Sequence, residues 1–129
     1  MREILFRGKR TDNGTWAYGY LFCIWERTYL CWGTTNDVPN MKEVIPETVG
    51  QYTGLTDKND VRIFEGDIIQ SLESIVTGLV QWFPEHSAFM VWCKSANEVG
   101  FLYECADIIK VIGNIHDNPG LLEGGEGDG

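Results

Sequence analysis

The stretch that most constrains the fold is residues 48–69, where two strand-like runs flank the strongest turn signal in the chain. The turn is residues 56–60, TDKND. Asp and Asn favour turns because their side chains bond to nearby backbone amides and tolerate a left-handed φ. After the turn, Val61 and Ile63 alternate with Arg62, a period of two that indicates a strand with one buried face. This pattern predicts antiparallel β structure with tight connections.

The remainder of the chain predicts further short strands separated by polar turns. Asn13-Gly14 indicates a hairpin, because this pair supplies the positive φ that two-residue hairpin turns need. The Thr, Asn, Asp and Pro residues of 34–41 predict a loop, and Gly78 predicts a bend or bulge. Asn118-Pro119 can start a helical turn through Leu122. The expected strands are residues 4–6, 15–24, 29–32, 44–45, 49–55, 61–64, 68–69, 75–83, 88–93, 101–103 and 108–112.

These elements predict a mainly β chain in two subdomains. Residues 1–48 are expected to form an antiparallel hairpin or partly open barrel, and residues 49–122 a small five-stranded barrel. Residues 123–129 contain mostly Gly and acidic residues, which bury no apolar surface, so a disordered tail is expected there.

Several motifs follow one another in a specific order: ETVGQYTGL at residues 47–55, DKN at 57–59, EGDI at 65–68 and VIGNI at 111–115. In this combination the chain resembles the YopX family, small proteins encoded by bacteriophages and prophages. The resemblance implies a mostly β fold, with an SH3-like barrel in the second half, and it brings no established chemistry. The family usually has Gly after the DKN motif, where this chain has Asp60. The motif residues, expected to be structural, are Gly50, Tyr52, Gly54, Asp57, Asn59, Glu65, Gly66, Asp67, Gly113 and Asn114.

The charge of the chain narrows the classes of partner. Ten Lys and Arg against 19 Asp and Glu give a formal net charge of −9. A negative charge argues against broad binding to nucleic-acid phosphates and to anionic membrane surfaces. It suits a protein partner with a basic face, or solubility alone.

The cysteines and the hydropathy pattern bear on the compartment. No apolar run approaches the ~18 residues that a membrane-spanning helix requires. Cys23, Cys31, Cys93 and Cys105 include no C-x-x-C pair, and the chain opens with a charged Met-Arg-Glu rather than an apolar segment. The cytoplasm of a bacterial host, with reduced thiols, is therefore expected.

Aromatic residues are concentrated in the first third of the chain, close to the basic Arg7, Lys9, Arg10 and Arg27. Small β barrels bind partners through aromatic faces, so this group is a candidate partner-binding surface. Core packing or an oligomer interface is the favoured alternative, because large aromatic side chains are the usual filling of a small core. The group comprises Trp16, Tyr18, Tyr20, Trp25, Tyr29 and Trp32.

Catalytic and metal sites are weakly indicated. Asp57 begins a pattern similar to a calcium loop, but Val61, Arg62 and Ile68 occupy positions that require a ligand, a Gly and a Glu. Glu65 and Asp67 can form a carboxylate pair, although a turn in which Asp67 accepts backbone amides is favoured.

The two histidines, His86 and His116, match no known ligand spacing with Cys93 or Cys105, and a Cys-His nucleophile pair has no further support. No catalytic residue, metal or cofactor is therefore predicted.

Three hypotheses of function follow. The preferred one is a non-enzymatic phage or prophage accessory protein that binds a protein partner or assembles with itself. The second is a nucleic-acid-associated module that uses Arg2, Arg7, Lys9 and Arg10, or an acidic mimic of nucleic acid. The third is a small hydrolase that uses Glu65, Asp67 or His116, motivated by residue type alone.

Overall fold

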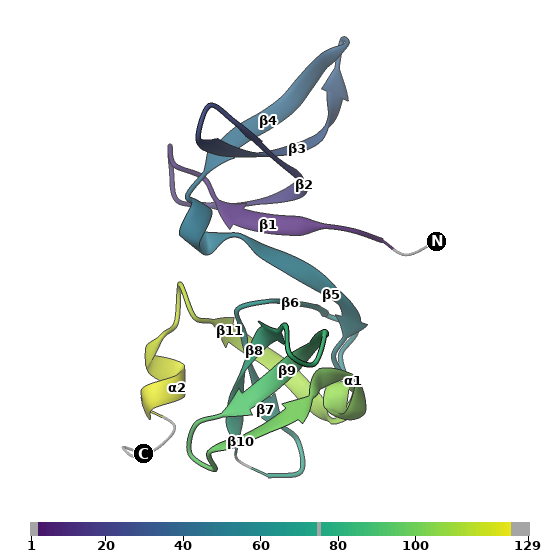
Figure 1. The fold of residues 1–129 in the computed structure, drawn as a ribbon, viewed down its shortest axis with the longest axis vertical. Coiled ribbons are helices and arrows are strands. Elements are labelled where there is room, and N and C mark those ends of the chain that lie inside the picture. Colours follow the sequence, from purple (N-terminus) through teal and green to yellow (C-terminus); the bar gives the residue numbers. More distant parts are fainter. Residues whose placement is uncertain (1–2, 75, 125–129) are drawn as a thin grey trace. The chain divides into compact units, whose positions relative to one another are not determined.

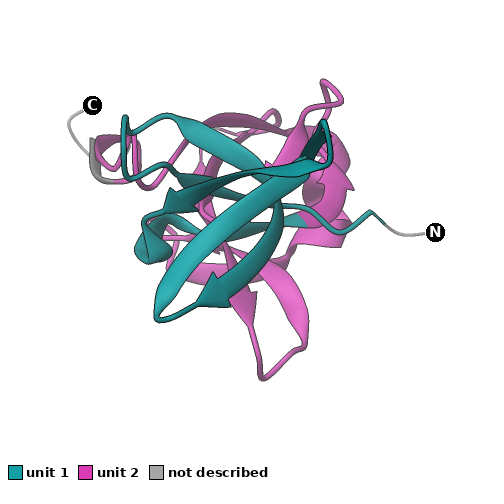
Figure 2. Ribbon diagram, turned by 90° about the horizontal axis from the view of Figure 1, so that it is seen from above, with its two compact units in different colours: residues 1–52 teal, residues 53–129 magenta. Residues whose placement is uncertain are grey.

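Antiparallel strands make up most of the chain, with 57% of residues in strands and 11% in helices. The computed structural model describes residues 3–74 and 76–124. It divides into two compact units, residues 1–52 and residues 53–129 (Figures 1 and 2). The prediction of a mainly β chain is confirmed.

Unit 1 is an antiparallel sheet in the strand order β4-β3-β2-β1-β5. Its core contains Ala17, Leu30 and Val44, with Phe6, Leu21 and Val49 packed against them. The elements, in chain order, are β1 (Phe6–Lys9), β2 (Trp16–Ile24), β3 (Arg27–Thr35), β4 (Val38–Val44), η1 (Pro46–Thr48) and β5 (Gly50–Thr56), the last of which continues into unit 2.

Unit 2 contains a five-stranded antiparallel sheet in the order β10-β9-β8-β7-β11. Its core is formed by Ile63, Ile69, Val80, Val91, Leu102, Ala106 and Ile109. Within residues 53–74 and 76–124 the strands form no closed barrel, whereas the sequence predicted a small barrel here. The elements are β6 (Arg62–Phe64), β7 (Asp67–Ser71), β8 (Thr77–Phe83), β9 (Ala88–Cys93), β10 (Glu98–Phe101), α1 (Leu102–Cys105), η2 (Ala106–Ile108), β11 (Ile109–Asn114) and α2 (Gly120–Gly124).

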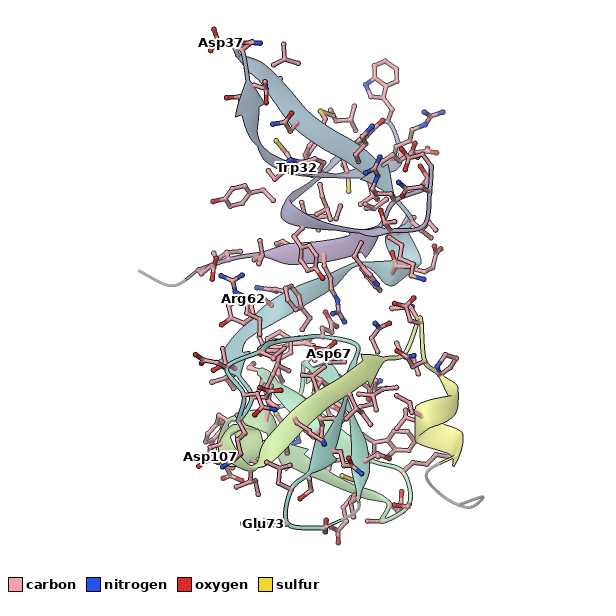
Figure 3. The ribbon with its side chains drawn as sticks, turned by 180° about the vertical axis from the view of Figure 1, so that it is seen from behind. Trp32, Asp37, Arg62, Asp67, Glu73 and Asp107 are labelled. Carbon is pink, nitrogen blue, oxygen red and sulfur yellow. The ribbon has the colours of Figure 1, made fainter. Side chains whose placement is uncertain are left out.

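Two hairpin turns in unit 1 have positive φ at both central residues, one at Asn and Asp, which tolerate it, and one at Trp and Glu, which seldom adopt it. Trp25 and Glu26 join β2 to β3 with φ of 54° and 67°, and Asn36 and Asp37 join β3 to β4 with φ of 54° and 66°. Positive φ at both central residues is the mark of the hairpin turn whose twist matches that of the flanking strands. The prediction of a loop over residues 34–41 is therefore wrong: this segment is a β hairpin with Asp37 at its tip (Figure 3).

Three other local predictions differ from the structure. The first strand begins at Phe6 rather than at Ile4. Leu102 and Tyr103 lie in the short helix α1 instead of a strand, because an apolar run this short does not distinguish the two. Gly78 pairs regularly with Ile69; an added Cβ would collide with the side chain of Val91, so close packing accounts for this glycine.

At the C-terminal end, the expected helical turn is present as α2, which runs to Gly124. The rest of the expected tail, residues 125–129, lies outside the described residues.

The turn at residues 57–61 caps the outer edge of β11. The Asp57 carboxylate accepts hydrogen bonds from the backbone N–H groups of Asn59 (2.8 Å) and Val61 (3.0 Å) through Oδ1, and from that of Val111 (2.8 Å) through Oδ2. Lys58 N donates to the carbonyl of Ile109 at 3.0 Å. Backbone groups on this edge of the sheet are thus satisfied by the turn instead of by another strand.

Asp60 follows the DKN motif, at the position where the family that the chain resembles usually has glycine, and it adopts a positive φ of 67°. A left-handed conformation costs an L-residue about 1–2 kcal/mol, less for Asp, and glycine avoids most of this cost. We expect Asp60→Gly to raise the free energy of unfolding by about 0.5 kcal/mol and Asp60→Ala to lower it by a similar amount. Urea denaturation measures both, and equal stability of the two variants would contradict the assignment.

No helix in residues 3–74 or 76–124 has the length and apolar character needed to cross a membrane.

Candidate functional site

The two faces of β2 differ in the size of their side chains. Ala17 and Gly19 point into unit 1 and are buried, whereas Tyr18 and Tyr20, with which they alternate, are exposed, Tyr20 to 68%. The expected alternative of burial in the core is therefore wrong for Tyr18 and Tyr20. It is also wrong for Trp25 and Trp32, which are exposed as well.

The small residue at position 19 brings β2 and β3 unusually close together. An added Cβ at Gly19 would overlap the backbone carbonyl of Cys31, whose carbon lies 2.8 Å from that position. The pairing of β3 with β4 shifts register just beyond Cys31, and Gly33 has a φ of 128°. This irregularity accompanies the turning of Trp32 toward β2.

Trp32 consequently forms one wall of a depression that we call the aromatic groove. Its volume is about 350 Å³. Trp16, Ala17 and Tyr18 line it from β2, and Arg10 supplies a cationic group. Figure 3 shows Trp32 on unit 1. A groove with two indoles and a phenol offers flat apolar surface with polar edges, the combination that is enriched in binding sites.

Three basic side chains lie near Trp16: Arg7, which is only 7% exposed, and the partly exposed Lys9 and Arg10. The guanidinium carbon of Arg7 lies 4.8 Å, and Nζ of Lys9 5.7 Å, from the Trp16 ring centroid, both within cation–π range. Arg10 donates two hydrogen bonds to Asp12, at 2.9 and 2.7 Å, and these hold the pKa of Asp12 below its usual value. Asp12 thereby fixes the position of Arg10 at the groove.

The three predicted aromatic residues outside the groove, Tyr20, Trp25 and Tyr29, lie in different surroundings. Trp25 occupies the β2–β3 turn and is 90% exposed. Tyr29 is half-buried and stacks on Phe22, with ring centroids 5.3 Å apart and an interplanar angle of 15°. The structure therefore brings Trp16, Tyr18 and Trp32 together in one groove, leaves Tyr20 and Trp25 exposed on unit 1, and gives Tyr29 an intramolecular partner.

The net charge of the chain resides in unit 2. Residues 1–52 contain six Lys or Arg and six Asp or Glu, so the formal charge of unit 1 is zero. Residues 53–129 contain four basic and thirteen acidic residues, which account for the whole −9. The aromatic groove is thus carried by a neutral unit with basic residues beside the aromatic rings.

The residues considered for catalysis make local backbone contacts in unit 2. Asp67 is 2% exposed and accepts a hydrogen bond from the N–H of Phe64 at 2.7 Å, as expected of a turn carboxylate (Figure 3). Asn114 accepts from the backbone N–H groups of His116 and Asp117 at 3.0 and 2.9 Å. In the described ranges, no three His, Cys, Asp or Glu side chains are grouped so as to hold a metal ion.

The four cysteines are free thiols. Burial, followed by the negative charge of Glu98, raises the pKa of Cys93. Burial, followed by nearby groups that include Asp107 and Glu104, raises the pKa of Cys105. Because the thiolate is the nucleophilic form, a raised pKa disfavours covalent catalysis by either residue.

Two members of the groove escaped sequence reasoning as lining residues. Ala17 gave no signal of its own, and Arg10 was noted as one of several basic residues close in sequence to the aromatic group, without a position in a groove. Alternation along β2 could have indicated that small residues face inward. The position of Trp32 depends on the irregular pairing around Gly33, which local sequence patterns do not reveal.

Comparison with known proteins gives one family and a structural relative. The model of a family described as YopX protein matches residues 5–123. A crystal structure of protein EF1440 from Enterococcus faecalis is similar, with a TM-score of 0.56 and 22% sequence identity, over 95% of this chain and 99% of that one. At this identity the likeness concerns the fold alone. No curated protein sequence matches the chain.

Proposed function

The chain belongs to the YopX family, and on that premise we propose that it is a phage or prophage accessory protein that acts by binding a protein partner, without catalysis, in the host cytoplasm. The observation that carries the proposal is the exposure of aromatic side chains on unit 1. Four large aromatic residues, Tyr18, Tyr20, Trp25 and Trp32, are exposed within one unit of about fifty residues. Contiguous exposed apolar surface on a protein marks an interaction site, and Tyr18 and Trp32 meet this condition because they line the same groove.

Trp25 adds an energetic argument. A bulky residue at positive φ is strained by about 1–2 kcal/mol, and Trp25 regains little of this through burial because 90% of it remains exposed. Strain of this kind is often stored at functional sites. We infer that contacts with the partner compensate the strain, and that Trp25 extends the binding surface beyond the aromatic groove.

Nucleic acid is the second candidate, favoured by the distribution of charge. Unit 1 lacks the negative charge that argued against phosphate binding, and the partly exposed Lys9 and Arg10 lie near Trp16, Arg10 as a lining residue of the groove. Aromatic stacking combined with basic side chains is the usual means of binding single strands. The absence of a net positive charge on unit 1 keeps this candidate second.

The test is a pull-down from lysate of phage-bearing bacteria, with and without nuclease, using four forms of the protein as bait. They are wild type, Trp32→Ser in the groove, Trp25→Asn/Glu26→Gly in the turn, and Tyr103→Ser as the matched control. Tyr103 is 64% exposed on unit 2, so its loss removes similar apolar surface elsewhere. We expect one protein to be retained by wild type and control, and at least about tenfold less by the two unit 1 variants.

The turn variant separates binding from folding. Asn-Gly is the preferred sequence for a hairpin turn with two positive φ values, so this variant should be at least as stable as wild type. Loss of the partner therefore cannot be attributed to unfolding. Equal retention by all four baits would contradict the proposal. Retention that nuclease abolishes would instead establish the nucleic-acid candidate.

A further inference from the structure

The two edges of the five-stranded sheet in unit 2 are treated differently. At β11, the turn at residues 57–61 occupies backbone groups of Ile109 and Val111. At the other edge, β10 pairs only with β9 in the described part of the chain (Figure 1). Its residues Glu98, Val99 and Gly100 are exposed. An open edge presents unpaired N–H and C=O groups that another chain can pair with.

β10 lacks two of the features that commonly prevent such pairing, proline and lysine, although it is only four residues long and begins with the charged Glu98. The edge strand β4 of unit 1 contains Pro39, which has no N–H, and Lys42, whose charge disfavours a second strand. The sequence of β10, Glu-Val-Gly-Phe, contains neither proline nor lysine. An added Cβ at Gly100 would meet no atom within 4 Å, so the face of the sheet is open at this residue.

An apolar cavity of about 290 Å³ adjoins this edge. Val99 and Gly100 contribute to it from β10, Val91 and Cys93 from β9, and Cys105 from α1. This volume is at the lower end of ligand pockets, which span roughly 300–1,000 Å³, and suits an apolar side chain better than a cofactor. Main-chain pairing at an edge combined with a side-chain pocket beside it is a recurrent mode of peptide recognition.

The surroundings of the cavity are acidic. Glu98 lines the cavity itself. Glu104 and Asp107 lie close enough to Cys105 for their charges to raise its pKa, after the larger effect of burial. Lys94 is the single basic residue between positions 88 and 108. A segment that approaches this edge would therefore be favoured if it carried positive charge.

We propose that β10 is the docking edge for an extended basic segment of a partner protein, which pairs as an added strand and places an apolar side chain in the cavity. This interaction goes beyond the binding proposed for the aromatic groove, because it involves a different unit, backbone pairing and opposite charge. Its specificity resides in the alternation of apolar and basic residues in the partner.

The experiment uses the full chain and short labelled peptides as probes. The basic probe is Ac-KVKLKVKV-NH2; the comparison probes are the acidic Ac-EVELEVEV-NH2 and a basic peptide of the same sequence N-methylated at alternate amides, which cannot pair with a strand edge. We expect fluorescence anisotropy to show at least about tenfold tighter binding of the basic probe than of either comparison probe. Val99→Lys should abolish this preference, and Val38→Lys, at an exposed position on β4 (63% against 45% for Val99), should preserve it.

The cysteines provide a direct readout of the cavity. When the basic probe is bound, N-ethylmaleimide should alkylate Cys93 and Cys105 more slowly, whereas the alkylation rate of the exposed Cys23 should not change. Peptide mass mapping measures the extent of alkylation at each cysteine. Undiminished binding of the N-methylated probe, unchanged binding to Val99→Lys, or no detectable binding of the basic probe would each overturn the proposal. So would concentration-dependent dimers that Val99→Lys dissociates, since a second copy would then occupy the edge.

Discussion

Asp57→Asn is expected to lower the free energy of unfolding by about 3 kcal/mol, because one side chain satisfies three backbone N–H groups. An asparagine amide has a single oxygen. If that oxygen takes the place of Oδ1, the NH2 group faces the N–H of Val111; if it takes the place of Oδ2, the NH2 group faces Asn59 and Val61. At least one hydrogen bond to a charged acceptor, about 1.5–3 kcal/mol, is lost in either orientation, and a buried donor is left facing another donor.

The measurement is urea denaturation followed by circular dichroism, with amide hydrogen exchange at Val111 as the local probe. Asp60→Asn is the matched control, since it makes the same chemical change three positions along, at an exposed residue of the same turn. It should change stability by no more than about 0.5 kcal/mol. Equal effects of the two substitutions would show that the loss of charge, and not the geometry at Asp57, determines stability.

Gly19→Ala is expected to lower the free energy of unfolding by about 2–3 kcal/mol. The new Cβ would collide with the carbonyl group of Cys31, which belongs to the backbone and cannot rotate away as a side chain does. β2 and β3 must therefore separate locally, and the groove wall formed by Trp32 must move with them. We expect the melting temperature to fall by roughly 10 °C and partner binding through the groove to weaken.

Gly100→Ala controls for the general effect of replacing a strand glycine. Gly100 lies in β10, where an added Cβ meets nothing within 4 Å. This substitution should leave the melting temperature within about 3 °C of wild type. Equal melting temperatures of the Gly19→Ala and Gly100→Ala proteins would indicate that the pairing of β2 with β3 does not depend on their close approach at Cys31.

The sequence anticipated features that follow from local chemistry. A turn was predicted at residues 56–60 from the hydrogen-bonding habits of Asp and Asn, and the structure shows Asp57 accepting hydrogen bonds from the backbone of Asn59 and Val61. The exceptional position of Asp60 followed from the motif, and its φ is positive. The third hydrogen-bond donor to Asp57, the N–H of Val111, was not foreseeable, because residues 54 apart are brought together only by the fold.

Features that run against residue preferences were missed. The pair Trp25-Glu26 forms a hairpin turn without the Asn or Gly that would announce it, and residues 34–41 have the composition of a loop although they pair as strands. For the aromatic residues of the first third of the chain, core packing or an oligomer interface was the favoured alternative to a partner-binding surface because of their size. On β2 the space inside is too small for them, since Gly19 allows β3 to approach, and the rings of Tyr18 and Tyr20 remain outside.

The hydrogen bond between Val111 and Asp57 also orders events during synthesis. The ribosome adds about 5–20 residues per second, so the 54 residues that separate the two partners take roughly 3–10 s to emerge. During this interval all of unit 1 has been made, while Asp57 lacks one of its donors and β7 lacks the neighbour that β11 will provide. The nascent chain therefore exposes the edge of β7 for seconds. Once residue 111 has been added, β11 can pair with this edge, and a chaperone is no longer needed to cover it.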